Sequence, residues 1–189
     1  MSAKTLALGA ILTALVIVLQ FMGSFIKLGM FSVSLVLIPI VIGAAMCGKY
    51  IGAWLGFVFG VVVLISGDAA AFLAINIPGT IATVLLKGTL CGLCAGLIYD
   101  LLAKKNKYLG VFAAAIICPI VNTGIFLLGC YFFFMEIVSE WAIAFGFGEN
   151  VVAYMFLGLA GGNFLFEVLF NIVLSPVIVR LLNISKRLG

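Results

Sequence analysis

One positive charge lies deep inside an apolar run of this chain. Lys87 belongs to the run from Pro78 to Leu102, which is long enough to cross a bilayer as a helix. At about 1.5 Å of rise per residue, Lys87 lies roughly 13 Å from Pro78. A charge at such a depth costs at least about 2.5 kcal/mol and is typical of a polar cavity, a charged partner or a substrate path. The alternative is that its flexible stem carries the ammonium back to the membrane surface.

Glu167 is the only other ionisable residue inside the predicted membrane spans. It can pair with Lys87 as a structural tie between helices. Alternatively, Lys87 binds a substrate carboxylate or phosphate, while Glu167, Asn122 and Asn163 bind hydroxyl and amide groups. Lys87, Asn122 and Asn163 are predicted at similar depths, which favours one pocket open to the outer side. No other residues complete a catalytic set around Lys87, so the chain is not expected to be an enzyme.

The cysteines do not form a metal site. Cys91 and Cys94 make a C-x-x-C, but the neighbouring spans supply no further ligands and the sequence has no histidine. We expect the five cysteines to be small packing residues, with no metal and no cofactor bound. A phosphate-binding glycine loop ending in Lys-Ser or Lys-Thr is also missing, so any ATP-driven step would need a partner protein.

The composition places the chain in the membrane. Hydrophobic residues make up 66% of the 189 residues and charged residues only 8%, which is far from soluble composition. We predict an all-α integral membrane protein, with residues 1–189 forming one domain of six transmembrane helices. The predicted helices cover 4–25, 32–46, a run after Lys49, 78–102, 108–134 and a run from 152.

Two series of small residues predict close helix contacts. Glycines recur every four residues at positions 48–60 and again at positions 88–96. Such stripes let helix backbones approach closely in lipid, so the third and fourth helices are expected to pack together, with Lys87 about 100° from the glycine face. Ala10 and Ala14 form a similar stripe on the first helix, either for docking a partner or for packing within the chain.

The basic residues set the topology. With a cytoplasmic amino terminus, only Lys27 falls outside, whereas the cytoplasmic side receives Lys4, Lys49, Lys104, Lys105, Lys107, Arg180, Lys186 and Arg187. This asymmetry places both termini in the cytoplasm. The net charge of +4 therefore reflects topology, and no nucleic-acid partner is expected. In the predicted outer segments 66–78 and 135–151, Asn76 and Trp141 are candidate substrate contacts, although Trp141 can equally be an interfacial anchor.

The chain resembles the substrate-binding S components of energy-coupling factor (ECF) vitamin transporters. The resemblance covers nearly the whole chain and lies in six helices, the A-x-x-x-A pair Ala10 and Ala14, and the segments FSVSLVLIPIVIGAAMCGKYIGAWLGFVFG, IPGTIATVLLKGTLCGLCAGLIY, IVNTGIFLLG and FLGLAGGNFLFEVLFNIVLSPVI. The pantothenate branch is the most similar: it shows a basic residue in helix four, Asn-Thr in helix five and G-x-N in helix six. The matching residues here are Lys87, Asn122 and Asn163, with lysine where arginine is expected. FSVSLVLIP lacks the acidic pattern of riboflavin carriers.

The resemblance implies a mechanism. An S component in the plasma membrane of a prokaryote captures a vitamin from outside, here pantothenate or else riboflavin, folate or a related molecule. The loop from Gly23 to Phe31 and Trp141 would close over the vitamin. The S component would dock through Ala10 and Ala14 on a transmembrane T component, and two ATPases would make it topple and release the vitamin inward. A self-sufficient secondary carrier and a purely structural protein, in which Lys87 only pairs with Glu167, are the alternatives.

Overall fold

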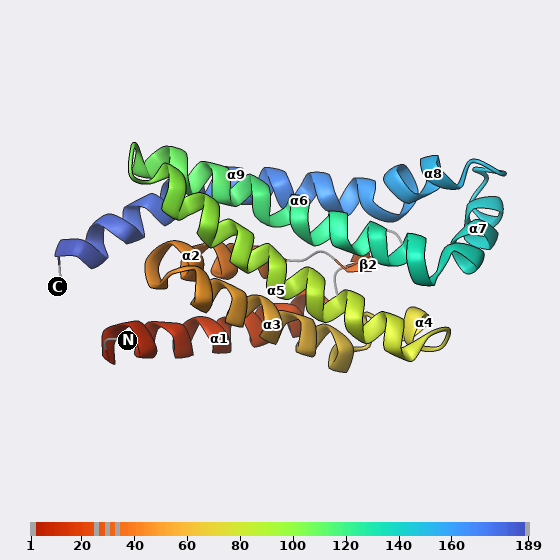
Figure 1. Cartoon of the computed structure of the whole chain (residues 1–189), viewed down its shortest axis with the longest axis horizontal. Coiled ribbons are helices and arrows are strands. Elements are labelled where there is room, and N and C mark those ends of the chain that lie inside the picture. Colours follow the sequence, from red (N-terminus) through yellow and green to blue (C-terminus); the bar gives the residue numbers. More distant parts are fainter. Residues whose placement is uncertain (1–2, 25–26, 29–30, 33–34, 188–189) are drawn as a thin grey trace.

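The chain folds as a bundle of long helices. The computed structural model describes residues 3–24, 27–28, 31–32 and 35–187. Five helical stretches in this part are long and apolar enough to cross a membrane. They are α1 (Ala3–Gly23), α3 (Lys49–Ser66), α5 (Ile77–Leu102), α6 (Lys107–Phe133) and a final run made of α8 (Val151–Ala153), the π-helix η1 (Tyr154–Gly161) and α9 (Gly162–Arg187). Figure 1 shows these helices running roughly along one axis.

Shorter elements connect the long helices. They are β1 (Lys27–Leu28), which pairs antiparallel with β2 (Phe31–Ser32), and the helices α2 (Leu37–Cys47), α4 (Ala70–Leu73) and α7 (Met135–Ala144). The segment 135–151, predicted as a loop, is therefore largely helical. Figure 1 shows α4 and α7 at one end of the bundle, and both chain termini at the other.

The second predicted helix is shorter than expected. It begins at Leu37 and has 11 residues, which gives about 16 Å of helix, less than the roughly 30 Å of a bilayer core. The expected six spanning helices are thus five, plus this short one. Pro39 lies in the first turn of α2, where its missing N–H has no helical partner in any case, so it does not bend the middle of the helix.

The two glycine stripes form the seam between α3 and α5. A Cβ atom added at Gly52 would lie 2.6 Å from the backbone oxygen of Gly92, and one added at Gly60 would lie 2.8 Å from that of Val84. Between these points, Gly56 and Gly88 bring the two backbones closer still. The predicted close packing is confirmed, because at this seam no side chain larger than hydrogen fits.

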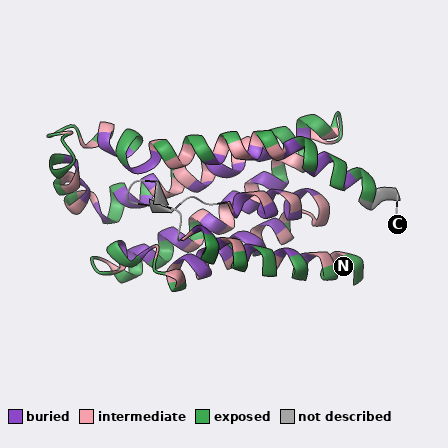
Figure 2. Cartoon of the chain, turned by 180° about the vertical axis from the view of Figure 1, so that it is seen from behind, coloured by how far each residue is buried: buried purple, intermediate pink, exposed green. Residues whose placement is uncertain are grey.

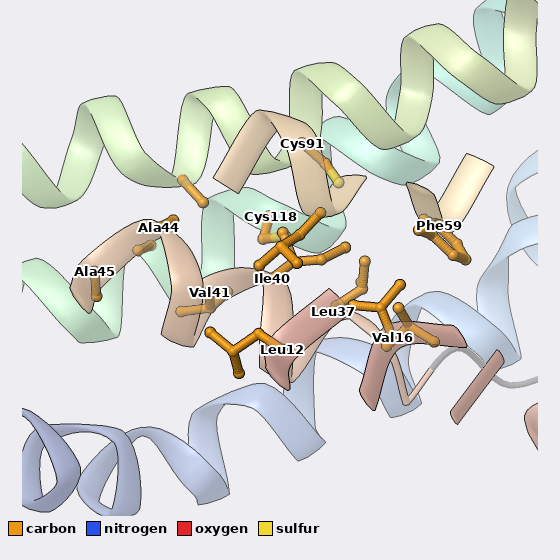
Figure 3. Packing of buried hydrophobic residues seen from close by; sticks show 14 of the residues in the cluster. Leu12, Val16, Leu37, Ile40, Val41, Ala44, Ala45, Phe59, Cys91 and Cys118 are labelled. Carbon is orange, nitrogen blue, oxygen red and sulfur yellow. The ribbon is translucent and has the colours of Figure 1, made fainter. Parts of the chain in front are cut away.

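The core lies between the helices, and the outer faces are apolar as well. Figure 3 shows side chains of α1 and α2, such as Leu12 and Ile40, gathered beside the buried Cys91 of α5 and Cys118 of α6. A second buried cluster surrounds Phe72 at the end of the bundle that carries α4 and α7. Figure 2 shows that the exposed residues follow the outward faces of the long helices. Many of them are large apolar residues, as expected for helices in contact with lipid tails.

Candidate functional site

A cavity opens inside the bundle, near the second cluster. Its volume is about 90 Å³. Six elements and one turn contribute its walls: α1, α3, the turn before α4, α4, α5, α6 and the run of η1 and α9. The lining residues are Gln20, Phe59, Val63, Asp68, Ala69, Phe72, Val84, Lys87, Asn122, Thr123, Phe126, Leu159, Ala160, Asn163 and Glu167. The cavity therefore joins segments that are far apart in the sequence.

Lys87 points into this cavity. Gly88 and Gly92, which follow Lys87 in the sequence, face α3 across the seam, and the lysine side chain lies on the adjoining face of α5. Its Nζ lies 5.5 Å from the ring centroid of Phe59 and 5.5 Å from that of Phe126. Both aromatic faces attract a cation. This position contradicts the alternative in which the ammonium returns to the membrane surface.

The electrostatic partners of Lys87 are two acidic residues of the same cavity. The carboxylates of Glu167 and Asp68 both act on its charge, Glu167 more strongly. Within the described part of the chain, however, no carboxylate is close enough to the ammonium to form an ion pair. The Lys87–Glu167 tie that the sequence allowed is thus a longer-range attraction. The ammonium keeps its three N–H donors available for an anion.

Two residues that line the same cavity carry a buried amide oxygen that has no donor among the described residues. Asn122 Oδ1 on α6 and Asn163 Oδ1 on α9 are buried, and neither accepts a hydrogen bond from any described residue. An unsatisfied buried acceptor costs about 1–3 kcal/mol, so such atoms in a native fold call for a partner outside the protein chain. Hydroxyl or N–H groups of a bound molecule would satisfy both oxygens.

The π-helix helps to position the residues that follow it. Leu159 and Ala160 of η1 line the cavity, and α9 begins directly after with Asn163 and Glu167 one turn apart on the same face. Hydrogen bonds from i to i+5 widen the turn and shift the angular register of the residues beyond it. Glu167 is 4% exposed.

Sequence reasoning missed a polar contact on the other wall of the cavity. Gln20 Nε2 donates to Asp68 Oδ2 at 2.6 Å, and Ser66 Oγ donates to the same oxygen at 3.4 Å. Gln20 is the only residue of α1 with an amide side chain, and this is the sequence feature that could have predicted the contact. Asp68 belongs to the segment 66–78 that was predicted on the outer side, and it lies in the turn between α3 and α4, where it lines the cavity. The aromatic residues Phe59, Phe72 and Phe126 gave no comparable signal among 17 phenylalanines.

Two predicted substrate contacts lie outside the cavity lining. Asn76 caps α5, because its Oδ1 accepts a hydrogen bond from the Gly79 N–H at 2.9 Å. Trp141 of α7 packs edge-on against Phe72, with 5.6 Å between ring centroids. Phe72 lines the cavity, so Trp141 contacts a residue of the cavity wall but does not line the cavity itself. Of the predicted lid loop, Gly23–Phe31, residues 25–26 and 29–30 lie outside the described part of the chain.

The small-residue stripe of α1 faces outward. Ala10 and Ala14 are exposed, whereas Leu12, Val16 and Gln20 on the inner face of the same helix are buried. Packing of the stripe within the chain, the alternative left open by the spacing, is therefore excluded. The stripe remains available to lipid or to a partner helix.

Comparison with known proteins identifies the family. The family described as "ECF transporter, substrate-specific component" matches this chain over residues 4–179. No curated protein and no solved structure matches it. The matched range contains all five membrane-crossing stretches except Ala3 and the last residues of the final run, as well as every residue that lines the cavity. A membrane-embedded bundle with a polar cavity and a match of this extent lead to one assignment: the chain is an integral membrane protein that belongs to the substrate-specific components of ECF transporters.

Proposed function

We propose that this chain binds an anionic vitamin in the cavity around Lys87 and delivers it to an ATP-driven energising module, with pantothenate as the best candidate. One observation carries the proposal: a lysine held between two aromatic rings shares a cavity with two asparagines whose amide oxygens have no donor in the described part of the chain. A carboxylate would meet the Lys87 ammonium, and hydroxyl or amide N–H groups would meet Asn122 and Asn163. Pantothenate carries one carboxylate, two hydroxyls and one amide N–H.

Riboflavin and folate are the alternative ligands for this cavity. Riboflavin offers many hydroxyls but no carboxylate, and folate offers carboxylates on a much larger body. The cavity volume of about 90 Å³ lies below the roughly 300–1,000 Å³ of typical small-molecule sites. We therefore infer that the bundle widens around its ligand. A compact vitamin needs the smallest change, which favours pantothenate over folate.

The proposed membrane topology follows from the helices and from the position of the basic residues. We infer that α2 lies in the inner half of the membrane and that the chain crosses the membrane six times, with both termini on the cytoplasmic side of the plasma membrane of a prokaryote. Basic residues at the end that holds both termini support this orientation. A green fluorescent protein fused to the carboxyl terminus should fluoresce in cells, whereas a fused alkaline phosphatase should be inactive; the reverse pattern would contradict the topology.

The proposed partners are those implied by the family. A transmembrane T component would bind the exposed stripe of Ala10 and Ala14, and two ATPase subunits would supply the energy. Docking through α1 is supported by the exposure of both alanines and by the smooth surface that small residues offer to another helix.

The deciding experiment compares ligand stabilisation in two matched variants. Thermal unfolding of the detergent-purified protein would be measured with pantothenate, riboflavin and folate. A ligand at 100 times its Kd stabilises the folded state by about 2.7 kcal/mol. Lys87→Met keeps the length of the side chain and removes its charge, and Lys104→Met does the same in the exposed turn before α6.

We expect pantothenate to raise the Tm of the wild type and of Lys104→Met but not that of Lys87→Met. Without ligand, Lys87→Met should be at least as stable as the wild type, because it removes a charge from the apolar interior. A pantothenate shift that persists in Lys87→Met would exclude the lysine as the anion contact. If no vitamin shifts the wild type and Lys87→Met merely unfolds more easily, the lysine is structural and the proposed substrate class is wrong.

A further inference from the structure

A groove on the outside of the bundle has no role in the proposed function. Two adjoining hollows, with volumes of about 480 and 370 Å³, lie between the start of α6 and the second half of α9. They share Tyr108, Pro176 and Val179 and so form one continuous depression, here named the α6-α9 groove. It lies toward the end of the bundle that holds both chain termini and the turn from α5 to α6 (Figure 1).

The helix ends on both sides of this groove are fixed locally. Asn106 Oδ1 accepts a hydrogen bond from the Tyr108 N–H at 2.8 Å and so sets the start of α6. On α9, Pro176 cannot donate to the carbonyl of Ile172, and Ser175 Oγ donates to that carbonyl instead at 2.8 Å. The serine hydroxyl thus gives the Ile172 carbonyl the hydrogen bond that Pro176 cannot give, and the proline remains inside α9 beside the groove.

The groove changes from polar to apolar along its length. Arg180 and Asn183 line the end nearer the carboxyl terminus, and Leu109 and Phe112 line the part that reaches farther along α6. Ser175 and Asn183 are eight positions apart, so the groove extends over about 12 Å of α9. A hollow that begins with a guanidinium and ends among aromatic and aliphatic side chains matches the headgroup and the acyl chains of a phospholipid.

The charge around the groove selects the type of headgroup. Arg180 has no hydrogen bond and no ion pair among the residues that the structure describes. Lys105 and Lys107 flank the groove residue Asn106 in the sequence, and the nearest acidic residue along α5 is Asp100. Basic hollows between membrane helices on the cytoplasmic side are suited to anionic lipids. A guanidinium binds two phosphate oxygens at once, and a tyrosine such as Tyr108 is at home at the interface.

We propose that the α6-α9 groove binds an anionic phospholipid, with Arg180 as the ligand of its headgroup phosphate and with Tyr108, Leu109 and Phe112 beside its glycerol and acyl chains. This site is separate from the cavity around Lys87 and does not depend on which vitamin that cavity binds. With the topology proposed above, its occupant is a lipid of the cytoplasmic leaflet rather than a protein segment, because the groove combines a guanidinium that has no partner among the described residues with exposed apolar side chains.

Native mass spectrometry tests the proposal with defined lipids. The purified chain would be mixed with equal amounts of phosphatidylglycerol and phosphatidylethanolamine that carry the same acyl chains. We expect bound phosphatidylglycerol to exceed bound phosphatidylethanolamine by at least about five-fold in the wild type. Arg180→Gln should bring this ratio close to one. Lys49→Gln removes one positive charge at the same end of the bundle, away from the groove, and should leave the ratio near its wild-type value.

A second variant fills the groove instead of changing its charge. Val177 is half exposed and lines the hollow next to Arg180, so Val177→Trp should lower the number of bound phosphatidylglycerol molecules while Arg180 remains in place. A wild-type ratio near one, an unchanged ratio in Arg180→Gln, or an equal loss in Lys49→Gln would each overturn the proposal. It would also be overturned if Arg180→Gln left the lipid ratio intact and weakened assembly with the energising module, because the groove would then be a protein interface.

Discussion

At the scale of single residues, the cavity places polar groups where the chain itself does not satisfy them. Asn122 and Asn163 each bury an amide oxygen to which none of the described residues donates, and such an unsatisfied group costs about 1–3 kcal/mol. Lys87 lies among phenylalanine rings with only distant carboxylates. Residues chosen for stability alone would be apolar at these positions. The pattern indicates that this part of the bundle is suited to an occupant.

Asn122→Leu tests this interpretation. Leucine has the same branched shape as asparagine and removes the unpaired acceptor, so the unfolding free energy of the ligand-free protein should rise by about 1–3 kcal/mol. The affinity for pantothenate should fall by roughly ten-fold, because one hydrogen bond to the ligand is lost. Thermal unfolding and isothermal titration calorimetry measure the two effects. Asn171→Leu is the control, since Asn171 is buried on α9 but does not line the cavity.

The two readouts separate the possible roles of Asn122. If Asn122→Leu lowers the stability of the free protein, the amide has a structural partner and the reasoning from its unpaired oxygen is wrong. If stability rises while pantothenate affinity is unchanged, the oxygen is unpaired but does not contact the ligand. A similar loss of affinity in Asn171→Leu would show that the effect is not specific to the cavity residue Asn122.

The sequence predicted the polar wall of the cavity better than its other walls. Lys87, Asn122, Asn163 and Glu167 stand out because each is polar within an apolar run, and all four line one cavity. The phenylalanines do not stand out, since hydropathy gives no information about which of many similar side chains faces inward. Asn76 illustrates another limit. A polar residue before a helix can bind a ligand or cap the helix, and only the hydrogen bond to Gly79 distinguishes the two.

At the scale of helices, the seam between α3 and α5 holds the cavity walls in place. Gly56→Ala would direct its methyl group into the backbone oxygen of Gly88. Backbone atoms cannot change rotamer, so the helices would have to separate, which typically costs about 1–3 kcal/mol. We expect the Tm in detergent to fall by about 5 °C. Gly124→Ala on α6 meets no atom within 4 Å, and its Tm should stay the same or rise slightly.

This pair of substitutions separates the seam from helix propensity. Both exchange glycine for alanine inside a long helix, so any general gain from the better helix former is common to them. An equal change in Tm for Gly56→Ala and Gly124→Ala would show that the contact between α3 and α5 has room for a methyl group. The glycine spacing predicted this seam because a stripe at every fourth residue is a property of sequence. The length of α2 and the π-helix were not predictable in this way, since composition does not determine where helical hydrogen bonds begin or which register they take.

At the scale of the whole molecule, α1 stands between the cavity and the outside. Its inner face carries Gln20, which donates to Asp68 at the cavity, and its outer face carries the exposed pair Ala10 and Ala14. Ala14→Trp should prevent assembly with the T component, because a large side chain blocks close helix approach. Ala82→Trp on the exposed face of α5 should not.

Co-purification with the reconstituted energising module measures assembly, and calorimetry with pantothenate measures the intact cavity. We expect Ala14→Trp to reduce assembly at least ten-fold, a loss of about 1.4 kcal/mol, while pantothenate affinity stays within about two-fold of wild type. Assembly that survives Ala14→Trp would remove α1 as the docking helix. An equal loss in Ala82→Trp would indicate a different or wider contact surface.

The glycine seam also determines which parts of the molecule can move relative to each other. Phe59 lies on α3 and Lys87 on α5. The ring and the ammonium above it therefore belong to two helices whose backbones are in close contact. The two helices should move as one rigid body, because sliding or rotation of one against the other would make their backbone atoms clash. Any widening of the cavity must then come from the opposite wall of η1 and α9, or from α1 and α4. The contacts of Lys87 and Phe59 with the anion would then stay the same through a transport cycle. Only the contacts of the other walls with the rest of the vitamin would form and break.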